Sequence, residues 1–427
     1  MPYLGDFALT ELHMHNYSTR YSKHGYGVDV RATYAHLPFP PFWTWLTGKD
    51  IRRLEPRHPR ETLLKEWQLW CQLAFSWSLI VAAVIAGIFV YRSESMGFMA
   101  KAGIIAVVWV IIVGRTRGVL HTFHYTNHGA SIADMSRARW IGKYFMSIPI
   151  LHTPWENYHK IHARVHHAIA VLCTDLDPDQ IFMIENRFWM GMGEREYWLK
   201  LVLSPFHPRA IWAHVRFRLE QNFIKTTTNE AIPRAAFWIV FISAVTYAGY
   251  LEEIAVVYFV PLFILTQFSS WLQHTTEHLW FATKAKDISP SLFVASLTWG
   301  RFLGRPHPGS GRGVRHMGRI AWWWFGALLI DLPIRVFAFM QDLPSHDFHH
   351  RSPRVNFWSI ARERAAHEGR PAKYGAMAET WGLMESWLIL RDHLCYAESD
   401  PFGLMSEARE RHSIRAISVD DQLAINS

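Results

Sequence analysis

The sequence predicts an all-α integral membrane protein, with at least two transmembrane helical hairpins and a cytoplasmic helical cap that carries clusters of histidine. Half of the 427 residues are apolar and 15% are aromatic, including 21 Trp, which is typical of rings at a bilayer boundary. The net charge of +8 accompanies long apolar runs, so it indicates cytoplasmic flanks that face anionic lipid rather than a nucleic-acid partner. The three cysteines (Cys71, Cys173, Cys395) are too far apart for a disulfide framework, which favours a reducing compartment.

Three regions follow from composition. Residues 1–68 form a polar, proline-punctuated cytoplasmic N-terminal arm, residues 69–394 a membrane-embedded domain, and residues 395–427 a polar C-terminal tail. The first 40 residues lack the charged and apolar regions of a signal peptide, so we expect internal segments to insert the chain.

Two hairpins are predicted from apolar runs. Residues 70–91 carry no charge and are long enough to cross a hydrocarbon core of about 30 Å. The shorter run 102–114 extends helically as far as His121, His124 and His128. Residues 235–250 and 254–273 form the second hairpin.

The charges around the hairpins predict their orientation. The turn at 251–253 carries no Lys or Arg, whereas the opposite ends of both hairpins are rich in them, so both hairpins are expected to begin and end in the cytoplasm. Residues 322–340 are apolar but contain Asp331, Pro333 and Arg335, and we expect an interfacial or re-entrant helix there. A multi-pass protein with every histidine cluster on its cytoplasmic side follows.

Four clusters contain the candidate metal ligands. On an α-helix, His162 and His166 share a face and could bind one ion while His167 points toward a second. The clusters are His124 and His128 with His121 one turn earlier; His162, His166 and His167 with His159; His274 and His278 with Glu277; and His346, His349 and His350.

One pair of histidines is weak evidence for a metal, but four clusters at the ends of membrane helices are strong evidence for one. Burying that many imidazoles without partners would cost too much free energy. Neutral imidazole binds iron, zinc or copper, and one ion takes four to six ligands. Eight or nine imidazoles therefore indicate two ions.

The order of the clusters resembles the integral-membrane di-iron superfamily of fatty acid desaturases and alkane hydroxylases, over roughly residues 70–350. The spacing is closest to the alkane-hydroxylase branch, whose second cluster is followed by Asp-Pro, here Asp177-Pro178, and whose Glu-His pair follows a membrane helix, here Glu277-His278. The iron ligands that the resemblance implies are His124, His128, His162, His166, His167, His278, His346, His349 and His350.

Other residues are expected around these ligands. His121, His159 and His274 lie one turn away and are candidate additional ligands or partners of ligands. Carboxylates could accept the distal N–H of a ligating imidazole, or alternatively serve as helix caps and solvated charges. These carboxylates are Asp175, Asp177, Glu277 and Asp347.

The resemblance implies an activity and its partners. Two non-haem iron ions and dioxygen would oxidise an unactivated C–H bond in a substrate held in an apolar tunnel. The chain has no four-cysteine rubredoxin or ferredoxin pattern, so an external electron donor of that type, with its reductase, is expected. A loop with Arg301, Arg305, Arg312 and Arg315 could bind a lipid headgroup, a CoA phosphate or an acidic acyl carrier, or contact anionic membrane.

The substrate is less defined than the chemistry. Tyr125 stands where alkane hydroxylases carry Glu, and Leu279-Trp280 where they usually carry Tyr-Gly. We therefore expect oxidation of a lipid acyl chain, as in the desaturases. Terminal hydroxylation of an alkane or fatty acid and oxidative decarboxylation to 1-alkenes are the alternatives.

Two other classes fit parts of the pattern. His274, Glu277 and His278 match the inverted zinc-protease motif, but a protease would leave three clusters unexplained. A histidine-rich metal transporter would place its ligands near the bilayer midplane rather than at helix ends.

Overall fold

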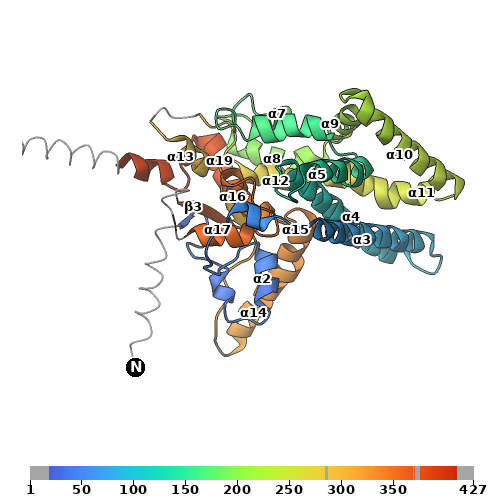
Figure 1. Cartoon of the computed structure of the whole chain (residues 1–427). Helices are drawn as coiled ribbons and strands as arrows, with labels where there is room; N and C mark the ends of the chain where they lie inside the picture. The colour runs from blue at the N-terminus through green and yellow to red at the C-terminus, as the bar shows by residue number, and fades with distance from the viewer. Residues whose placement is uncertain (1–18, 284–286, 369, 371–375, 411–427) are drawn as a thin grey trace, which may run out of the picture.

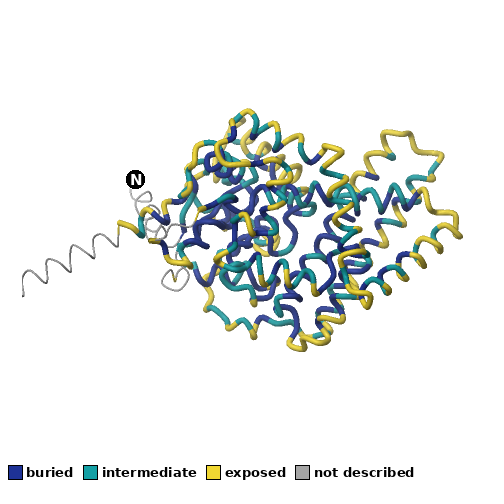
Figure 2. The backbone as a smooth tube through the Cα atoms, turned by 90° about the horizontal axis from the view of Figure 1, so that it is seen from above, coloured by how far each residue is buried: buried dark blue, intermediate teal, exposed yellow. Residues whose placement is uncertain are grey.

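The computed structural model describes residues 19–283, 287–368, 370 and 376–410. The chain is mostly helical, and two long helical hairpins project from one side of a body built of shorter helices (Figure 1). Figure 2 shows buried residues concentrated in the body and exposed residues along the hairpins.

The first hairpin consists of α3 (Glu66–Arg92) and α4 (Phe98–Asn127). Both are long and apolar enough to cross a membrane. Large apolar side chains such as Phe75, Ile85 and Phe89 are exposed on α3, as expected of a surface that faces lipid. The helix predicted at 70–91 is confirmed, and so is the continuation of the run 102–114 as one helix that carries His121 and His124.

The second hairpin consists of α10 (Thr228–Tyr247) and one continuous helix formed by α11 (Leu251–Ile254), η9 (Ala255–Leu265) and α12 (Thr266–Glu277). The continuous helix, Leu251–Glu277, is long and apolar enough to cross a membrane, whereas α10 is not among the helices that meet this description. Glu230 and Arg234, in the first two turns of α10, lower its hydropathy.

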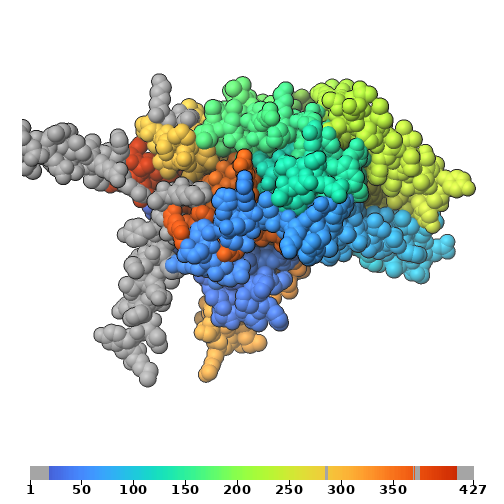
Figure 3. All heavy atoms as spheres, in the orientation of Figure 1, coloured from blue at the N-terminus to red at the C-terminus, as the bar shows by residue number. Residues whose placement is uncertain are grey.

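The two hairpins touch at their turns. The Arg92 guanidinium at the end of α3 pairs with Glu253 and donates to the Gly249 carbonyl oxygen at 2.7 Å. The space-filling view shows both hairpins extending together from the body (Figure 3).

Residues 314–337 form one continuous helix of α14 (Val314–Gly326), η10 (Ala327–Asp331) and α15 (Leu332–Phe337). This helix is also long and apolar enough to cross a membrane. Two of its charged side chains have partners in the body: Asp331 pairs with Arg305 at 3.1 Å, and Arg335 donates to the Trp45 and Gln341 carbonyl oxygens. It descends steeply in Figure 1, whereas α3 and α4 run across the view. That orientation is compatible with the interfacial helix predicted from the sequence.

Four helices of the described residues are therefore candidate membrane spans, and they indicate a membrane protein. The number of crossings and the cytoplasmic placement of the body stay predictions.

A small parallel sheet of order β1-β3-β2 joins distant segments in the body. Its strands are β1 (Thr19–Tyr21), β2 (Gly300–Phe302) and β3 (Met377–Trp381). Thr19 is paired with Met377, and Gly300 with Glu379. Beneath the sheet, Lys49 is buried and donates to both carboxylate oxygens of Glu379 at 2.7 and 2.8 Å.

The regions expected to be an arm and a tail contribute to the body. Val30, Tyr34, Trp43 and Leu46 lie in a buried cluster with Phe302 and Trp381, so residues 19–68 pack on the domain. Phe402 and Leu404 are likewise buried. Residues 1–18 and 411–427 lie outside the described residues.

Shorter helices complete the body and the region between the hairpins. They are α2 (Pro40–Thr47), α5 (Met135–Ile141), η4 (Gly142–Ser147), α6 (Trp155–Tyr158), η6 (His159–His166), α7 (Pro178–Glu185), α8 (Glu194–Leu203), α9 (Pro208–Leu219), η8 (Glu220–Ile224), α13 (Pro290–Leu297), α16 (His346–Arg351), α17 (Ile360–Glu368) and α19 (Leu383–Tyr396). Single 3₁₀ turns are η2 (Ala32–Tyr34), η3 (Pro59–Thr62), η5 (Ile148–Ile150), η7 (Ser204–Phe206) and η11 (Leu343–Ser345).

Candidate metal centre

The nine histidines that the resemblance implies as ligands lie together in two adjacent groups. In each group the ligand atoms all lie within 4.8 Å of one another. The first group is His124, His128, His162, His167 and His349, and the second is His166, His278, His346 and His350.

Four Nε2 atoms of the first group form a closed ring. The separations are 2.8 Å from His124 to His349, 3.2 Å from His349 to His167, 3.3 Å from His167 to His162 and 3.1 Å from His162 to His124. Nitrogen ligands at right angles on a metal ion, with bonds of about 2.1 Å, lie about 3 Å apart. A neutral ring nitrogen either donates or accepts, so four nitrogens in mutual contact suit a shared cation better than hydrogen bonds.

The second group has the same character. The Nε2 atoms of His346 and His350 lie 3.1 Å apart, and the His278 ring lies 4.8 Å from the His350 ring and 5.3 Å from the His166 ring. His278 is completely buried, and neither of its nitrogens has a hydrogen-bond partner among the described residues. An unpaired buried polar group costs about 1–3 kcal/mol, so these nitrogens indicate a missing ligand.

The protonation state suits metal binding. Burial lowers the pKa of His128, His167 and His349 well below the usual value, and neighbouring imidazoles lower it further. The same holds for His278, His346 and His350. Neutral imidazole is the form that binds a divalent ion, so the donor set fits a pair of metal ions.

The residues of η6 are divided between the groups differently from the helical prediction. His162 lies with His167 in the first group, and His166 belongs to the second. The cause is the wider π-helical turn, in which the His167 N–H donates to the His162 carbonyl oxygen at 3.2 Å, so that residues five apart share a face. The prediction that His162 and His166 face one ion and His167 another differs from this division, although His162 and His166 also lie together with Asp179 in a third possible metal group.

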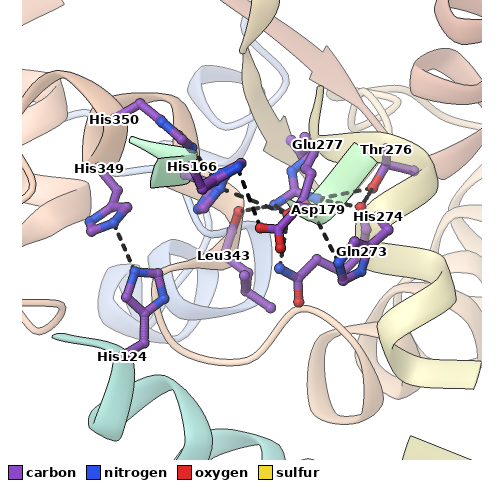
Figure 4. Close-up of polar contacts among 12 residues, drawn as sticks. His124, His166, Asp179, Gln273, His274, Thr276, Glu277, Leu343, His349 and His350 are labelled. Carbon is purple, nitrogen blue, oxygen red and sulfur yellow. Dashed lines mark hydrogen bonds and ion pairs between the residues drawn. The ribbon is translucent and has the colours of Figure 1, made fainter. Parts of the chain in front are cut away.

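The short helix α16 also serves both groups. His346 and His350 are four residues apart and share a face toward the second group, whereas His349 points toward His124 (Figure 4).

Two carboxylates contact His166. Its Nδ1 lies 2.8 Å from Asp177 and 3.4 Å from Asp179, and Asp179 is also 3.6 Å from Nδ1 of His162. Burial lowers the pKa of His166, but the charge of Asp179 and the hydrogen bond to Asp177 outweigh it and raise the pKa to about 9. At neutral pH the metal-free ring is therefore protonated on both nitrogens, and a metal ion would displace the Nε2 proton. The proton that stays on Nδ1 beside Asp177 would make Nε2 a stronger donor.

The other predicted carboxylates have different partners. The Glu277 carboxylate lies 3.8 Å from Nε2 of His346 and accepts a hydrogen bond from Gln273 at 2.8 Å (Figure 4). Asp347 accepts from Nε of Arg364 at 3.0 Å, and Asp175 accepts from Gln180 at 3.2 Å.

The three additional histidines lie outside the two groups. His159 contacts the Asn127 side-chain oxygen at 3.0 Å, and Nδ1 of His274 contacts the Ser270 carbonyl oxygen at 2.9 Å. His121 is buried, and its nitrogens have no partner among the described residues. Because His274 is outside the group that contains His278, the two do not form the metal pair of an inverted zinc-protease motif.

Sequence reasoning missed two residues of the site. Asp179 follows Asp177 by two positions at the start of α7, and this proximity was the available signal. Tyr158 precedes His162 by one turn, and its ring stacks on the His162 ring at 5.0 Å.

A cavity of about 1250 Å³ opens beside the two groups, between α4 and α12 on one side and α7, α8 and α9 on the other. His124, His162 and His346 of the metal groups line it together with Tyr158, and Arg117 and Arg218 line it as well.

Half of the predicted arginine loop is not available for a headgroup. Arg301 is buried and donates to the carbonyl oxygens of Gln273 and Leu343, while Arg305 pairs with Asp331. Arg312 and Arg315 are exposed.

Comparison of the chain with protein-family models and with curated proteins gives no match.

Proposed function

We propose that this protein is a membrane-bound, dioxygen-dependent, non-haem di-iron oxidoreductase that oxidises an unactivated C–H bond in a lipid acyl chain. The single observation that carries the proposal is the convergence of nine histidines from four distant segments into groups of five and four. Groups made only of imidazole nitrogens suit a redox-active transition metal better than magnesium or calcium, which prefer oxygen ligands.

When bound, the two iron ions would supply the activation of dioxygen that removal of hydrogen from an unactivated carbon requires. The protein's own residues hold and orient the imidazoles: Asp177 keeps the proton of His166 on Nδ1, and Asp179 lies close to one imidazole of each group. The cavity beside the groups is large enough for a lipid-sized substrate and would limit its contact with water.

The alternatives of the same chemistry remain terminal hydroxylation and oxidative decarboxylation to 1-alkenes. An external ferredoxin- or rubredoxin-type donor would supply electrons. The exposed Arg187 and Arg209 at the rim of the cavity have no acidic partner among the described residues and could attract an acidic protein.

Mass spectrometry of lipids and free chains from cells that express the wild type, His166→Ala or His36→Ala tests the proposal. His36 is exposed and outside both groups, so its variant serves as the matched control. We expect oxidised chains with the wild type and the control, and none with His166→Ala. New double bonds, hydroxyl groups or terminal alkenes would distinguish the three reactions. Identical products from His166→Ala and the wild type would contradict the proposal.

A further inference from the structure

The cavity beside the metal groups is lined by two arginines that form no salt bridge with a carboxylate of the described residues. Arg117 lies on α4 and Arg218 at the end of α9, and both line the cavity. Arg117 belongs to a candidate membrane span and Arg218 does not, and both donate to residues of the continuous helix Leu251–Glu277.

Arg117 is only 4% exposed, yet it bonds to neutral groups alone. It donates from Nη1 to the Ser270 hydroxyl at 2.7 Å and from Nη2 to the Gln273 side-chain oxygen. Its Nε has no partner among the described residues.

Arg218 is half-buried and likewise bonds to neutral groups alone. It donates to the carbonyl oxygens of Leu262, at 2.8 Å, and Ile150, and to the Thr266 hydroxyl at 3.0 Å. Its Nε is also without a partner among the described residues. Burial lowers the pKa of Arg218 only to about 10, so the group stays charged at neutral pH.

No carboxylate of the described residues forms a salt bridge with either guanidinium. Among the acidic residues that line the cavity, Glu220 pairs with Arg216 and Lys225, and Glu196 pairs with Lys200. Glu277 lies 3.9 Å from Nη2 of Arg301 and acts on Arg117 only through space. A buried charge is costly unless an opposite charge accompanies it. The opposite charge is therefore expected from a ligand.

We propose that this cavity binds the anionic head of a single-chain amphiphile, a carboxylate or a phosphate, between Arg117 and Arg218. The inference rests on the proposed function for the role of the metal groups, and it names the substrate class of that site. A neutral alkane would leave both guanidinium charges unbalanced.

The position of Arg117 also limits which carbon can react. Arg117 precedes His124 by seven residues on the same helix, which places the two about 10 Å apart along its axis. A head held near Arg117 therefore presents carbons close to the head, rather than the far end of a long chain, to the metal groups.

Binding to the purified, detergent-solubilised full-length protein tests the inference without any turnover. A fluorescent fatty acid serves as the probe, and palmitate, hexadecyl phosphate and hexadecanol compete for it. We expect palmitate or hexadecyl phosphate to bind the wild type at least about tenfold more tightly than hexadecanol, because bonds to a charged group are stronger than neutral ones. Whichever anion binds more tightly identifies the head.

Arg117→Gln and Arg218→Gln should each weaken binding of the anion by about tenfold and leave hexadecanol binding unchanged. Arg195→Gln is the matched control, since Arg195 is exposed on α8 and does not line the cavity. Its variant should bind as the wild type does. If Arg117→Gln does not fold, Arg218→Gln and the comparison of the three ligands on the wild type still test whether the cavity binds an anionic head.

Equal binding of palmitate, hexadecyl phosphate and hexadecanol by the wild type would overturn the inference. So would an equal loss of all three ligands in the variants, which would indicate a structural role for the arginines. Either result would leave the proposed di-iron oxidation intact, because the experiment does not depend on turnover. Conversely, a failure of the proposed oxidation would not change the binding affinities that this experiment measures.

Discussion

At the scale of single residues, His274 and His278 illustrate what spacing alone does not resolve. They stand four residues apart, but α12 ends at Glu277 and His278 takes an extended conformation. His278 therefore turns into the second group, while His274 bonds to the backbone of its own helix and packs against Phe182. The helix end, not the spacing, separates a candidate ligand from a structural histidine.

This difference predicts distinct metal contents. His278→Ala removes one of four imidazoles in the second group and should reduce the iron bound per purified chain to half of the wild-type value or less. His274→Ala is the matched control and should retain the full amount. Elemental analysis of both proteins after reconstitution with ferrous iron measures this, and an equal loss in both would contradict the division of the groups.

Glu385 is a second residue with an unusual environment. Its carboxylate accepts from the Trp381 N–H at 2.6 Å and packs over Gly25, where a Cβ atom would lie 2.2 Å from it. Burial raises the pKa of Glu385 to about 7, although hydrogen bonds from Trp381 and Ser22 lower it in part.

A carboxyl whose pKa is raised by folding favours the protonated form, so stability falls as the pH rises from the ordinary glutamate value to about 7. Glu385→Gln should remove this loss and stabilise the protein at pH ~8 by up to about 3 kcal/mol, with little effect near pH ~4.5. Thermal unfolding in detergent at both values measures the difference. The exposed Glu94→Gln is the control, and a pH-independent effect of Glu385→Gln would contradict the interpretation.

At the scale of elements, long apolar helices and clustered histidines were predictable, whereas departures from α-helical geometry were not. α3 follows from an uninterrupted apolar run, and α4 from the shorter run 102–114 and its helical extension to the first histidine cluster. The π-helical turn of η6 places His162 and His167, five residues apart, in one group. The resemblance therefore pointed to the candidate ligands, whereas the periodicity of an α-helix predicted a different grouping of His162, His166 and His167.

The close packing of α4 against α15 gives a prediction for Gly114. A Cβ atom at this position would lie 2.1 Å from the Val336 carbonyl oxygen, so Gly114→Ala should destabilise the protein by about 1–3 kcal/mol through overpacking. Gly103, on the same helix, has open space around it, and Gly103→Ala should stabilise by roughly 0.5–1 kcal/mol. Thermal midpoints in one detergent compare the two, and equal shifts would argue against this helix contact.

At the scale of the whole molecule, segments more than two hundred residues apart meet at one place. The sequence predicted which histidines converge, because their spacing is local. It did not predict the sheet, whose strands β1 and β2 have three residues each and pair with β3 from the other end of the chain. Nor did it predict Arg117 and Arg218 across one cavity, which depends on how α9 covers α4.

Removing metal should affect the entire fold. Without ions, nine imidazoles crowd together and several buried nitrogens lack partners, so a ligand that binds only the folded state stabilises it. Treatment with a chelator should lower the thermal midpoint by several degrees, and ferrous iron should restore it. A variant that lacks His124 and His278 should show no response to the chelator; a full response there would place the metal elsewhere.

The neighbouring pairs His166–His167 and His349–His350 divide their side chains between the two groups. Under the proposed function, an ion bound by one group orders the backbone that also carries imidazoles of the other group. The second ion then binds with a smaller loss of conformational entropy. Iron uptake is then cooperative, and chains with a single ion remain scarce during loading. The enzyme would be either empty or complete, which protects it from the uncontrolled oxygen chemistry of a lone iron.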